Sequence, residues 1–385
     1  MGIIRVMESL KSRKLGENIE KWLFKGYILI IYGARQVGKT TLVKSLLEKS
    51  SDKNSLYLTC DDFDTKTTLE NADNFSDLKN FIGSPEILVI DEAQRIKNIG
   101  LKLKLLFDNL ENTQIIVTGS SSFELANEVN EPLTGRSLSF KLYPFSVNEV
   151  CENQVEIQRN IDKFMLYGSY PKIFLTPEHI VEKALKEIAE QYLYKDLLSI
   201  AGIQKPEILI KLLKLLAYQI GQEFSYNEIA SSLGIDKKSV EKYIDILEKS
   251  FVVFRLGPYS KNLRNELKKL RKIYFYDLGI RNALINDFND LEIRPDLGHL
   301  WENFCILERM KFNEYKEDNP NYYFWRNHEK KEIDLVEDWG RKKALQAFEF
   351  KYGKNTKYQF PKDFIGTYPG VEGRVINKES FQDLL

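Results

Sequence analysis

The sequence predicts an α/β protein that begins with a doubly wound parallel sheet and continues into a helical segment, a helix–turn–helix unit and a second α/β domain. Three observations support this fold class. From residue 27, short apolar runs alternate with longer helical stretches, which is typical of a parallel sheet with helices on both faces. After Tyr143 and Pro144 the pattern becomes helical. From residue 273 it returns to short strands rich in aromatic residues.

Length and composition indicate a folded chain of several domains. With 385 residues, of which 43% are hydrophobic and 29% charged, it has apolar material for more than one core. Its 56 basic and 56 acidic side chains cancel, so binding to nucleic acid would depend on a local patch. The three cysteines and three histidines are scattered, which argues against a disulfide scaffold or a zinc finger. Apolar runs stay well below the roughly 18 residues of a membrane helix and the N-terminus lacks a signal-peptide core, so we expect a cytoplasmic protein without a membrane partner.

The elements follow one another in a regular order. Each apolar run of the first part is short enough to be a buried strand; the runs are Tyr27–Tyr32, Leu56–Cys60, Ile87–Ile90, Ile115–Thr118 and Leu138–Leu142. The segments between them, such as Lys39–Lys49 and Leu101–Leu110, have helix-forming residues at helical spacing. We expect four domains, namely a sheet core at 1–150, a helical lid at 151–205, a winged helix at 206–258 and a C-terminal domain at 259–385.

A glycine-rich motif, Gly33-Ala-Arg-Gln-Val-Gly-Lys-Thr40, stands between the first apolar run and the next helix. This is the pattern and the context of a P-loop, whose glycines let backbone N–H groups face phosphates at the positive end of a helix. Lys39 would reach the β- and γ-phosphates, and the Thr40 hydroxyl would bind magnesium. The sequence therefore predicts a site for ATP and Mg²⁺ formed by Gly33, Ala34, Arg35, Gln36, Val37, Gly38, Lys39, Thr40 and Thr41.

An acidic motif follows in Ile87-Leu-Val-Ile-Asp91-Glu92, an apolar strand that ends in two acids. The carboxyl edge of an open α/β sheet is where its ligands bind. Asp91 is suited to hold the magnesium ion, and Glu92 to orient and deprotonate the attacking water. Together with the P-loop, this motif predicts ATP hydrolysis.

Two further segments each have two interpretations. Thr118 and Ser120, at the end of the fourth apolar run, either contact the γ-phosphate or the lytic water, or cap the next helix. Arg136, in Leu-Thr-Gly-Arg just before the fifth run, either stabilises transition-state charge in the site of a neighbouring copy or forms an ordinary surface salt bridge. The first interpretation of Arg136 implies a homo-oligomer.

Residues 20–150 resemble the core of AAA+ type P-loop ATPases. The motifs Gly-Ala-Arg-Gln-Val-Gly-Lys-Thr, Val-Ile-Asp-Glu-Ala-Gln, Thr-Gly-Ser-Ser and Leu-Thr-Gly-Arg are similar to those of one prokaryotic branch, in which the ATPase core is joined to an uncharacterised C-terminal domain with a nuclease-like fold. The resemblance implies the strand order 5-1-4-3-2, with the strand of Thr118 between the strands of the P-loop and of Asp91. It also favours Arg136 as an arginine finger.

Residues 223–247 have the form of a helix–turn–helix, in which Gly234 makes the turn and Asp236 or Ser239 caps the second helix. The apolar strand that starts at Phe251 fits a wing, so a winged helix is expected. The exposed face of the second helix would present Lys237, Lys238, Ser239, Lys242 and Tyr243. That face suits DNA, but acids on the same helix also suit a protein partner.

A basic run at 261–272 is the second candidate for contact with DNA. It consists of Lys261, Arg264, Lys268, Lys269, Arg271 and Lys272. In an otherwise neutral chain this is the best local candidate for a phosphate-contacting patch. The alternative is a solvated helix face that Glu266 partly neutralises.

A last group of residues lies near the C-terminus. Glu349 and Lys351 alternate onto one strand face and Asp334 lies on the preceding strand, so a hairpin would bring the two carboxylates together. Two carboxylates and a lysine can hold magnesium and position a water against a phosphodiester. The pattern resembles the Asp…Glu-x-Lys core of restriction-endonuclease-like, PD-(D/E)xK-type folds, in which Glu302 would match the acid on a helix. A structural salt bridge on a strand is the alternative.

Two functions therefore compete. The first is an ATP-driven, DNA-associated ATPase with a metal-dependent nuclease-like domain. The second is an ATP-dependent signalling or protein-interaction switch whose nuclease-like domain is inert.

Overall fold

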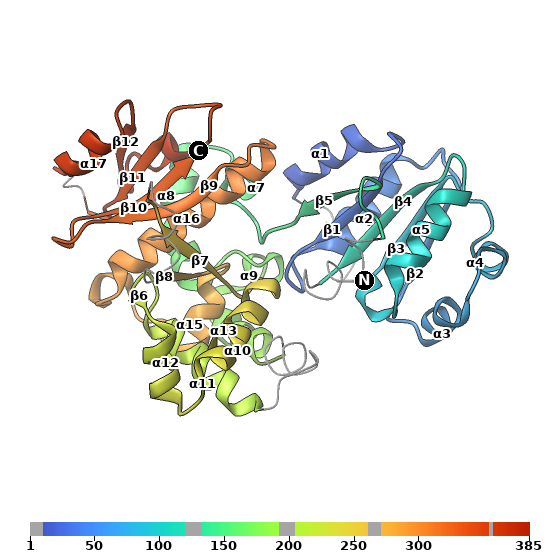
Figure 1. Cartoon of the computed structure of the whole chain (residues 1–385), viewed down its shortest axis with the longest axis horizontal. Helices are drawn as coiled ribbons and strands as arrows, with labels where there is room; N and C mark the ends of the chain where they lie inside the picture. The colour runs from blue at the N-terminus through green and yellow to red at the C-terminus, as the bar shows by residue number, and fades with distance from the viewer. Residues whose placement is uncertain (1–10, 121–131, 192–204, 261–270, 354–356) are drawn as a thin grey trace. The chain divides into compact units, whose positions relative to one another are not determined.

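The computed structural model describes residues 11–120, 132–191, 205–260, 271–353 and 357–385 (Figure 1). The chain divides into two compact units. The first comprises Met1–Phe145 with Lys249–Phe251, and the second comprises Ser146–Glu248 with Val252–Leu385. Among the helices that can be described, none has both the length and the hydropathy needed to cross a membrane.

The first unit is built on a parallel sheet of five strands in the order β2-β3-β4-β1-β5. The strands are β1 (Ile28–Tyr32), β2 (Ser55–Thr59), β3 (Ile87–Asp91), β4 (Gln114–Gly119) and β5 (Ser137–Lys141). This is the expected order 5-1-4-3-2, in which β4 separates β1 from β3. Every residue of β3 and β4 is buried, because a parallel sheet is covered on both faces.

Helices connect these strands. They are α1 (Lys14–Trp22), α2 (Lys39–Lys49), α3 (Phe63–Asn71), α4 (Phe75–Ile82), the 3₁₀ turn η2 (Ala93–Arg95) and α5 (Ile99–Asn109). Helices α4 and α5 cover one face of the sheet with Leu78, Leu103 and Leu106, which pack in one core cluster with Ile28 and Ile90. The sheet and its helices hold the carboxyl ends of β1, β3 and β4 in a fixed arrangement, and the predicted nucleotide residues lie at these ends.

The second unit begins with α7 (Val147–Val150), α8 (Gln154–Tyr167), α9 (Pro171–Phe174) and α10 (Glu178–Gln191). These helices fall in the segment predicted as a lid at 151–205, of which residues 192–204 are outside the described residues. Both α8 and α10 pack against α15 (Leu278–Ile285). The predicted lid helices therefore contribute to the core of the second unit.

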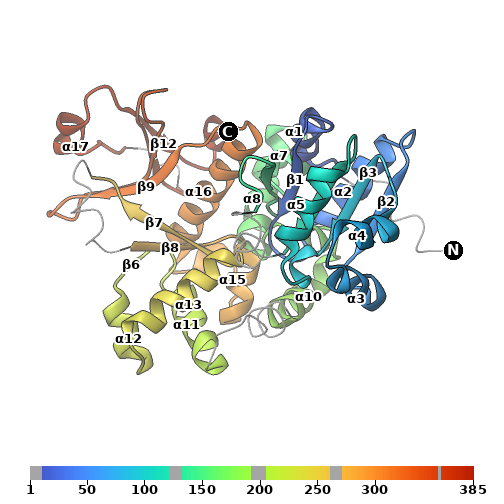
Figure 2. The same ribbon diagram turned by 45° about the vertical axis from the view of Figure 1, so that its right-hand side comes forward.

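The next elements are α11 (Pro206–Tyr218), β6 (Glu223–Phe224), α12 (Tyr226–Leu233), α13 (Lys237–Lys249), β7 (Val253–Pro258) and β8 (Arg271–Phe275). We interpret this order, with β8 paired antiparallel to both β6 and β7, as a winged helix; Figure 2 shows β7 beside β8. Gly234 takes a left-handed conformation that ends α12, and Asp236 caps α13 by accepting the Ser239 N–H at 3.0 Å. Tyr243 departs from expectation, since it is buried beside Val240 and Ile244 rather than exposed for DNA.

The C-terminal part contains η4 (Leu291–Ile293), α16 (Leu297–Tyr315), β9 (Asn321–Arg326), β10 (Glu332–Asp338), β11 (Gln346–Phe350), α17 (Lys362–Thr367), β12 (Glu372–Ile376) and η5 (Phe381–Leu384). Its strands join those of the winged helix in one sheet of seven, ordered β12-β11-β10-β9-β7-β8-β6. The junction is a short parallel pairing of β7 with β9, Gly257 with Tyr323 and Pro258 with Phe324. The predicted boundary at 258/259 thus falls inside a continuous sheet.

Candidate functional site

The P-loop forms the turn from β1 into α2. Gly38 adopts φ +96°, a left-handed conformation that favours glycine. Gly33 has no room for a side chain, because an added Cβ would lie 2.1 Å from the carbonyl oxygen of Leu142. Arg13, which precedes α1, holds the loop from outside by donating to the Val37 carbonyl and to the Tyr143 carbonyl, each at 2.6 Å. Arg13 carries no sequence signal that would have identified this contact.

The Lys39 side chain lies within the arch of the loop. Its Nζ donates to the carbonyls of Gly33 and Ala34, both at 3.0 Å, and the residue is buried. Thr40 is partly exposed at the start of α2, whereas Thr41 is exposed. The ammonium is therefore held by two carbonyl oxygens of the P-loop, close to the loop whose N–H groups would face phosphates.

Asp91, at the end of β3, is the centre of a hydroxyl cluster. Thr40 Oγ1 donates to Asp91 Oδ2 at 2.9 Å, and the Tyr57 and Thr118 hydroxyls also donate to this carboxylate. Burial, reinforced by Asp91, raises the pKa of Tyr57. The oxygen donors of Thr40 and Asp91 fit the hard Mg²⁺ ion, which prefers such ligands. Sequence reasoning found Asp91, Thr40 and Thr118 but not Tyr57, which lies on the neighbouring strand β2.

Thr118 makes contacts that neither of its two predicted roles included. Its hydroxyl donates to Asp91 and accepts the backbone N–H of Glu92 at 3.0 Å, and it is completely buried. It therefore orients the two acids at the end of β3. Ser120, two residues further on, is only partly buried.

Glu92 is linked to Ser120 through Gln94. The Gln94 amide nitrogen Nε2 donates to Glu92 Oε2 at 2.6 Å and to Ser120 Oγ at 2.9 Å. Glu92 itself has φ 55°, in the left-handed region. Gln94 belongs to the acidic motif of the sequence, but its role as a link appears only in three dimensions because Ser120 is 26 residues away.

Arg136 lies at the amino end of β5, where its carbonyl accepts the N–H of Ile28 at 2.8 Å. The P-loop follows the opposite end of β1, so Arg136 and the P-loop are at opposite edges of the sheet. The Arg136 guanidinium pairs with Asp108 of α5, Nε to Oδ1 at 2.9 Å, and both side chains are about one-third exposed. Arg136 thus forms a surface ion pair and does not reach the P-loop of its own chain.

A second group of polar residues lines a pocket of about 740 Å³ in the C-terminal part. Glu302 comes from α16, Asp334 from β10, and Glu349 and Lys351 from the end of β11. The structure therefore brings all four predicted residues to one pocket. Lys351 Nζ pairs with Glu349 Oε1 at 2.5 Å.

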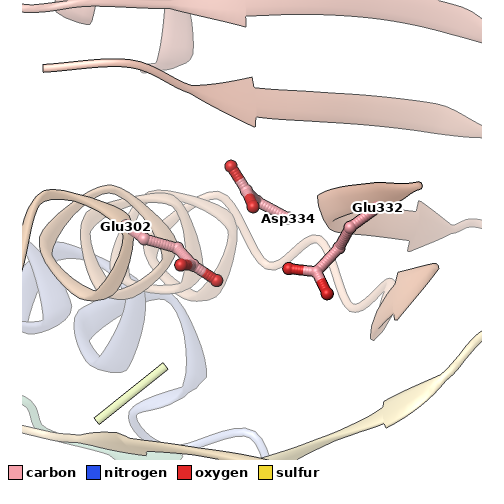
Figure 3. Close-up of side chains that lie close together, drawn as sticks. All are labelled: Glu302, Glu332 and Asp334. Atoms are coloured by element: carbon pink, nitrogen blue, oxygen red, sulfur yellow. The ribbon is translucent and has the colours of Figure 1, made fainter. Parts of the chain in front are cut away.

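The tightest cluster of acids in this pocket differs from the expected one. Carboxylate oxygens of Glu302, Glu332 and Asp334 lie within 4.8 Å of one another, and in Figure 3 the three side chains approach one space from the helix and the strand. Glu332 was not predicted as a ligand, although its position two residues before Asp334 puts it on the same strand face. The Oε2 atom of Glu349 is buried and has no hydrogen-bond partner by geometry within the described part of the chain, and the nearby Tyr358 hydroxyl donates to the Glu332 carbonyl.

The electrostatics of the pocket follow from this crowding. Burial, together with the charges of Glu302 and Glu349, raises the pKa of Asp334 well above its usual value. Burial also raises the pKa of Glu349, against the opposing effect of Lys351. Burial acts to raise the pKa of Glu302 as well, but Lys272 and other donors hold it below the usual value.

Lys272 was expected in a basic surface patch, but its side chain points into the protein. It is buried, and its Nζ donates to Glu302 Oε1 at 2.8 Å and to Glu332 Oε1 at 2.5 Å. Tyr274, two residues later, donates to the same Glu302 oxygen at 2.5 Å. Of the other members of the run, Arg271 is partly exposed, and Lys261, Arg264, Lys268 and Lys269 lie outside the described residues. Lys272 therefore serves an internal site rather than a surface.

The fold and this site define the first unit as a P-loop nucleotide-binding domain. Residues 25–151 match the family model described as an AAA domain, so the first unit is similar to P-loop ATPase domains of the AAA type. Residues 158–291 and 297–383 match two domains of unknown function, DUF8612 and DUF4143.

Individual proteins resemble the chain over most of its length. An uncharacterized protein of Mycobacterium tuberculosis is 29% identical over 338 residues, which cover 86% of this chain and 72% of that protein. An uncharacterized protein of Haemophilus influenzae is 27% identical over 285 residues, 67% of this chain and 69% of that one. Among solved structures, the Walker-type ATPase of Pyrococcus abyssi matches with a TM-score of 0.50 at 16% identity, covering 72% of this chain and 97% of that chain. At this identity the likeness concerns the fold alone.

Proposed function

We propose that the protein binds and hydrolyses magnesium ATP at the P-loop of its first unit. The observation that carries the proposal is the contact of Thr40 with Asp91, 2.9 Å apart and next to the Lys39 ammonium. Lys39 and the loop N–H groups bind the β- and γ-phosphates, and Thr40 and Asp91 would hold Mg²⁺, which would neutralise charge on the phosphates. Glu92 takes the proton of the attacking water, and Ser120, which is linked to Glu92 through Gln94, is proposed to contact the γ-phosphate or that water.

The test compares two substitutions in the full chain. Lys39→Ala should abolish ATP binding, whereas Glu92→Gln should keep binding and lose turnover by about 10²- to 10⁴-fold, the usual contribution of a general base. Glu48→Gln, which alters an exposed acid on α2, is the matched control and should behave like the wild type. Equal hydrolysis by Glu92→Gln and wild type would remove Glu92 from the role of base.

A second activity is proposed for the C-terminal pocket, because Glu302, Asp334, Glu349 and Lys351 converge there. We propose that this nuclease-like pocket holds a divalent cation and acts on phosphodiesters. The carboxylate oxygens of the pocket fit a divalent cation. The clustered acids and the Oε2 atom of Glu349 are the kind of oxygen ligand that Mg²⁺ and Mn²⁺ prefer. Glu302 and Asp334 would hold the ion, which supplies an activated water. The Lys351 ammonium stabilises negative charge on the phosphate after its ion pair with Glu349 has opened.

The cleavage test uses single- and double-stranded DNA and RNA with Mg²⁺ or Mn²⁺. Asp334→Asn should abolish cleavage, Glu372→Gln, an exposed acid on β12, should not, and Lys39→Ala reveals whether cleavage depends on ATP. If none of these substrates is cut with either metal, the pocket is inert and the protein-interaction switch becomes the better proposal.

Association with DNA is proposed through α13. Lys237, Lys238 and Lys242 are exposed on this helix, and Lys237 lies 3.4 Å from Glu241. The double variant Lys238→Ala/Lys242→Ala should weaken DNA binding and lower the salt slope by about 2, roughly one per lost phosphate contact. Lys214→Ala, an exposed lysine on α11, is the control. Equal DNA affinity of the double variant and the control would favour a protein partner at α13.

A further inference from the structure

Two acids of the C-terminal pocket are bound by a buried lysine of β8. Lys272 lies on the strand between β7 and β6 in the sheet and pairs with Glu302 and Glu332, which line the pocket. Its Nζ lies 2.8 Å from Glu302 Oε1 and 2.5 Å from Glu332 Oε1, and its side chain is only 3% exposed. These are two of the three acids whose oxygens lie within 4.8 Å of one another. The ammonium thus binds the same acids that form the cation-binding cluster.

Other basic groups near the pocket also lie beside carboxylates: His299 Nδ1 is 3.6 Å from Glu302 Oε2, and Lys331 pairs with Glu329 at 2.8 Å. Lys351 pairs with Glu349 at 2.5 Å. Arg326 lies 3.7 Å from Glu332 but makes its shorter contact, 2.6 Å, with Glu223. A divalent cation at the cluster would need the carboxylates of Glu302 and Glu332 that Lys272 holds, and it would also repel the ammonium.

We propose that Lys272 is the resident cation of this pocket and competes with divalent metal for Glu302 and Glu332. The inference rests on the cation site proposed above and specifies how that site is controlled. The main chain of Lys272 is fixed, because Glu223 of β6 and Leu256 of β7 pair with it on either side. The exchange of ammonium for metal therefore requires the side chain to rotate away while the strand stays in place. The wild-type pocket consequently has low metal affinity.

The test measures Mn²⁺ binding to the full chain without nucleotide. Binding is monitored by calorimetry and by the loss of the electron paramagnetic resonance signal of free Mn²⁺. Lys272→Gln removes the charge but can still donate to both acids, so it should fold, and it should bind one Mn²⁺ at least tenfold more tightly than wild type. Lys272→Arg keeps the cation and should gain no affinity. Lys311→Gln, which neutralises another buried lysine, 2.7 Å from Glu308, is the matched control and should not gain affinity either.

The additional substitution Asp334→Asn distinguishes failure of the cation site from failure of the competition by Lys272. If Lys272→Gln gains affinity and the gain disappears in Lys272→Gln/Asp334→Asn, competition at this pocket is supported. If Asp334→Asn weakens Mn²⁺ binding by the wild type but Lys272→Gln binds no more tightly, the cation site stands and the competition is refuted. If neither wild type nor Lys272→Gln has a Mn²⁺ site sensitive to Asp334→Asn, both the cation site and the competition are refuted.

Discussion

Gly33→Ala should damage the P-loop by a purely steric route. An added Cβ would lie 2.1 Å from the Leu142 carbonyl oxygen and 3.1 Å from its carbon. Since real Cβ atoms essentially never approach other heavy atoms closer than 3.0 Å, the loop and the end of β5 must separate by about 0.9 Å. The obstacle is backbone, and the N–H of Leu142 is bonded to the Tyr32 carbonyl at 2.8 Å, so it cannot move aside by rotating a side chain.

The size of the effect follows from this displacement. Forcing extra volume into a packed site typically costs about 1–3 kcal/mol of stability. A shift of about 1 Å in a positioned site can cost on the order of 100-fold in function, so we expect a loss of that order in ATP affinity.

Two measurements check the prediction. One is titration with a fluorescent ATP analogue, and the other is thermal unfolding with and without magnesium ATP. The control is Gly366→Ala on α17, where an added Cβ meets nothing within 4 Å and the substitution should be harmless. If Gly33→Ala bound ATP and unfolded like the wild type, the steric argument for glycine at this position would be refuted.

Three further outcomes are expected. Gln94→Leu should leave ATP affinity intact but lower turnover, because the carboxylate of Glu92 loses the amide donor that orients it; unchanged turnover would contradict this link. If Arg136 serves a neighbouring copy, ATPase activity per chain should rise with protein concentration in the wild type and not in Arg136→Ala, and a flat wild-type curve would contradict it. Burial raises the pKa of Asp277 from 3.8 to about 6, so the folded protein holds this proton more tightly than the unfolded chain. The free energy of unfolding should therefore fall as pH rises from about 4 to about 6, by roughly 3 kcal/mol from this group, and denaturant titrations of Asp277→Asn should lack that component.

The first unit could be predicted well from the sequence because its signals are local. The P-loop occupies eight consecutive residues, and the apolar runs around Asp91 and Thr118 mark their strands directly. The choice between the two roles of Thr118 could not be made, because its partners Asp91 and Glu92 are 27 and 26 residues away. Contacts at that range depend on how strands line up in the sheet.

The C-terminal pocket was predictable only in part for the same reason. Asp334 and Glu349 belong to adjacent antiparallel strands, so a hairpin argument brings them together. Lys272 is 30 residues from Glu302 and 60 from Glu332, and although all three fall in the predicted C-terminal domain at 259–385, Lys272 was expected in a basic surface patch. A run of basic residues in sequence does not indicate which member turns inward, and here Lys272, at the end of the run, is buried.

The pairing of β7 with β9 has a practical consequence for anyone who divides this protein into pieces. A cut at 258/259 would separate β7 from β8 and β9, and β6 from β8, and would leave unpaired strand edges on both fragments. Exposed edges of this kind recruit other chains, so both fragments should aggregate even though each retains most of its own hydrophobic core. A chimeric protein should therefore carry both α13, the helix proposed to bind DNA, and the C-terminal pocket proposed to cleave it. The two belong to one continuous sheet structure and cannot be exchanged separately.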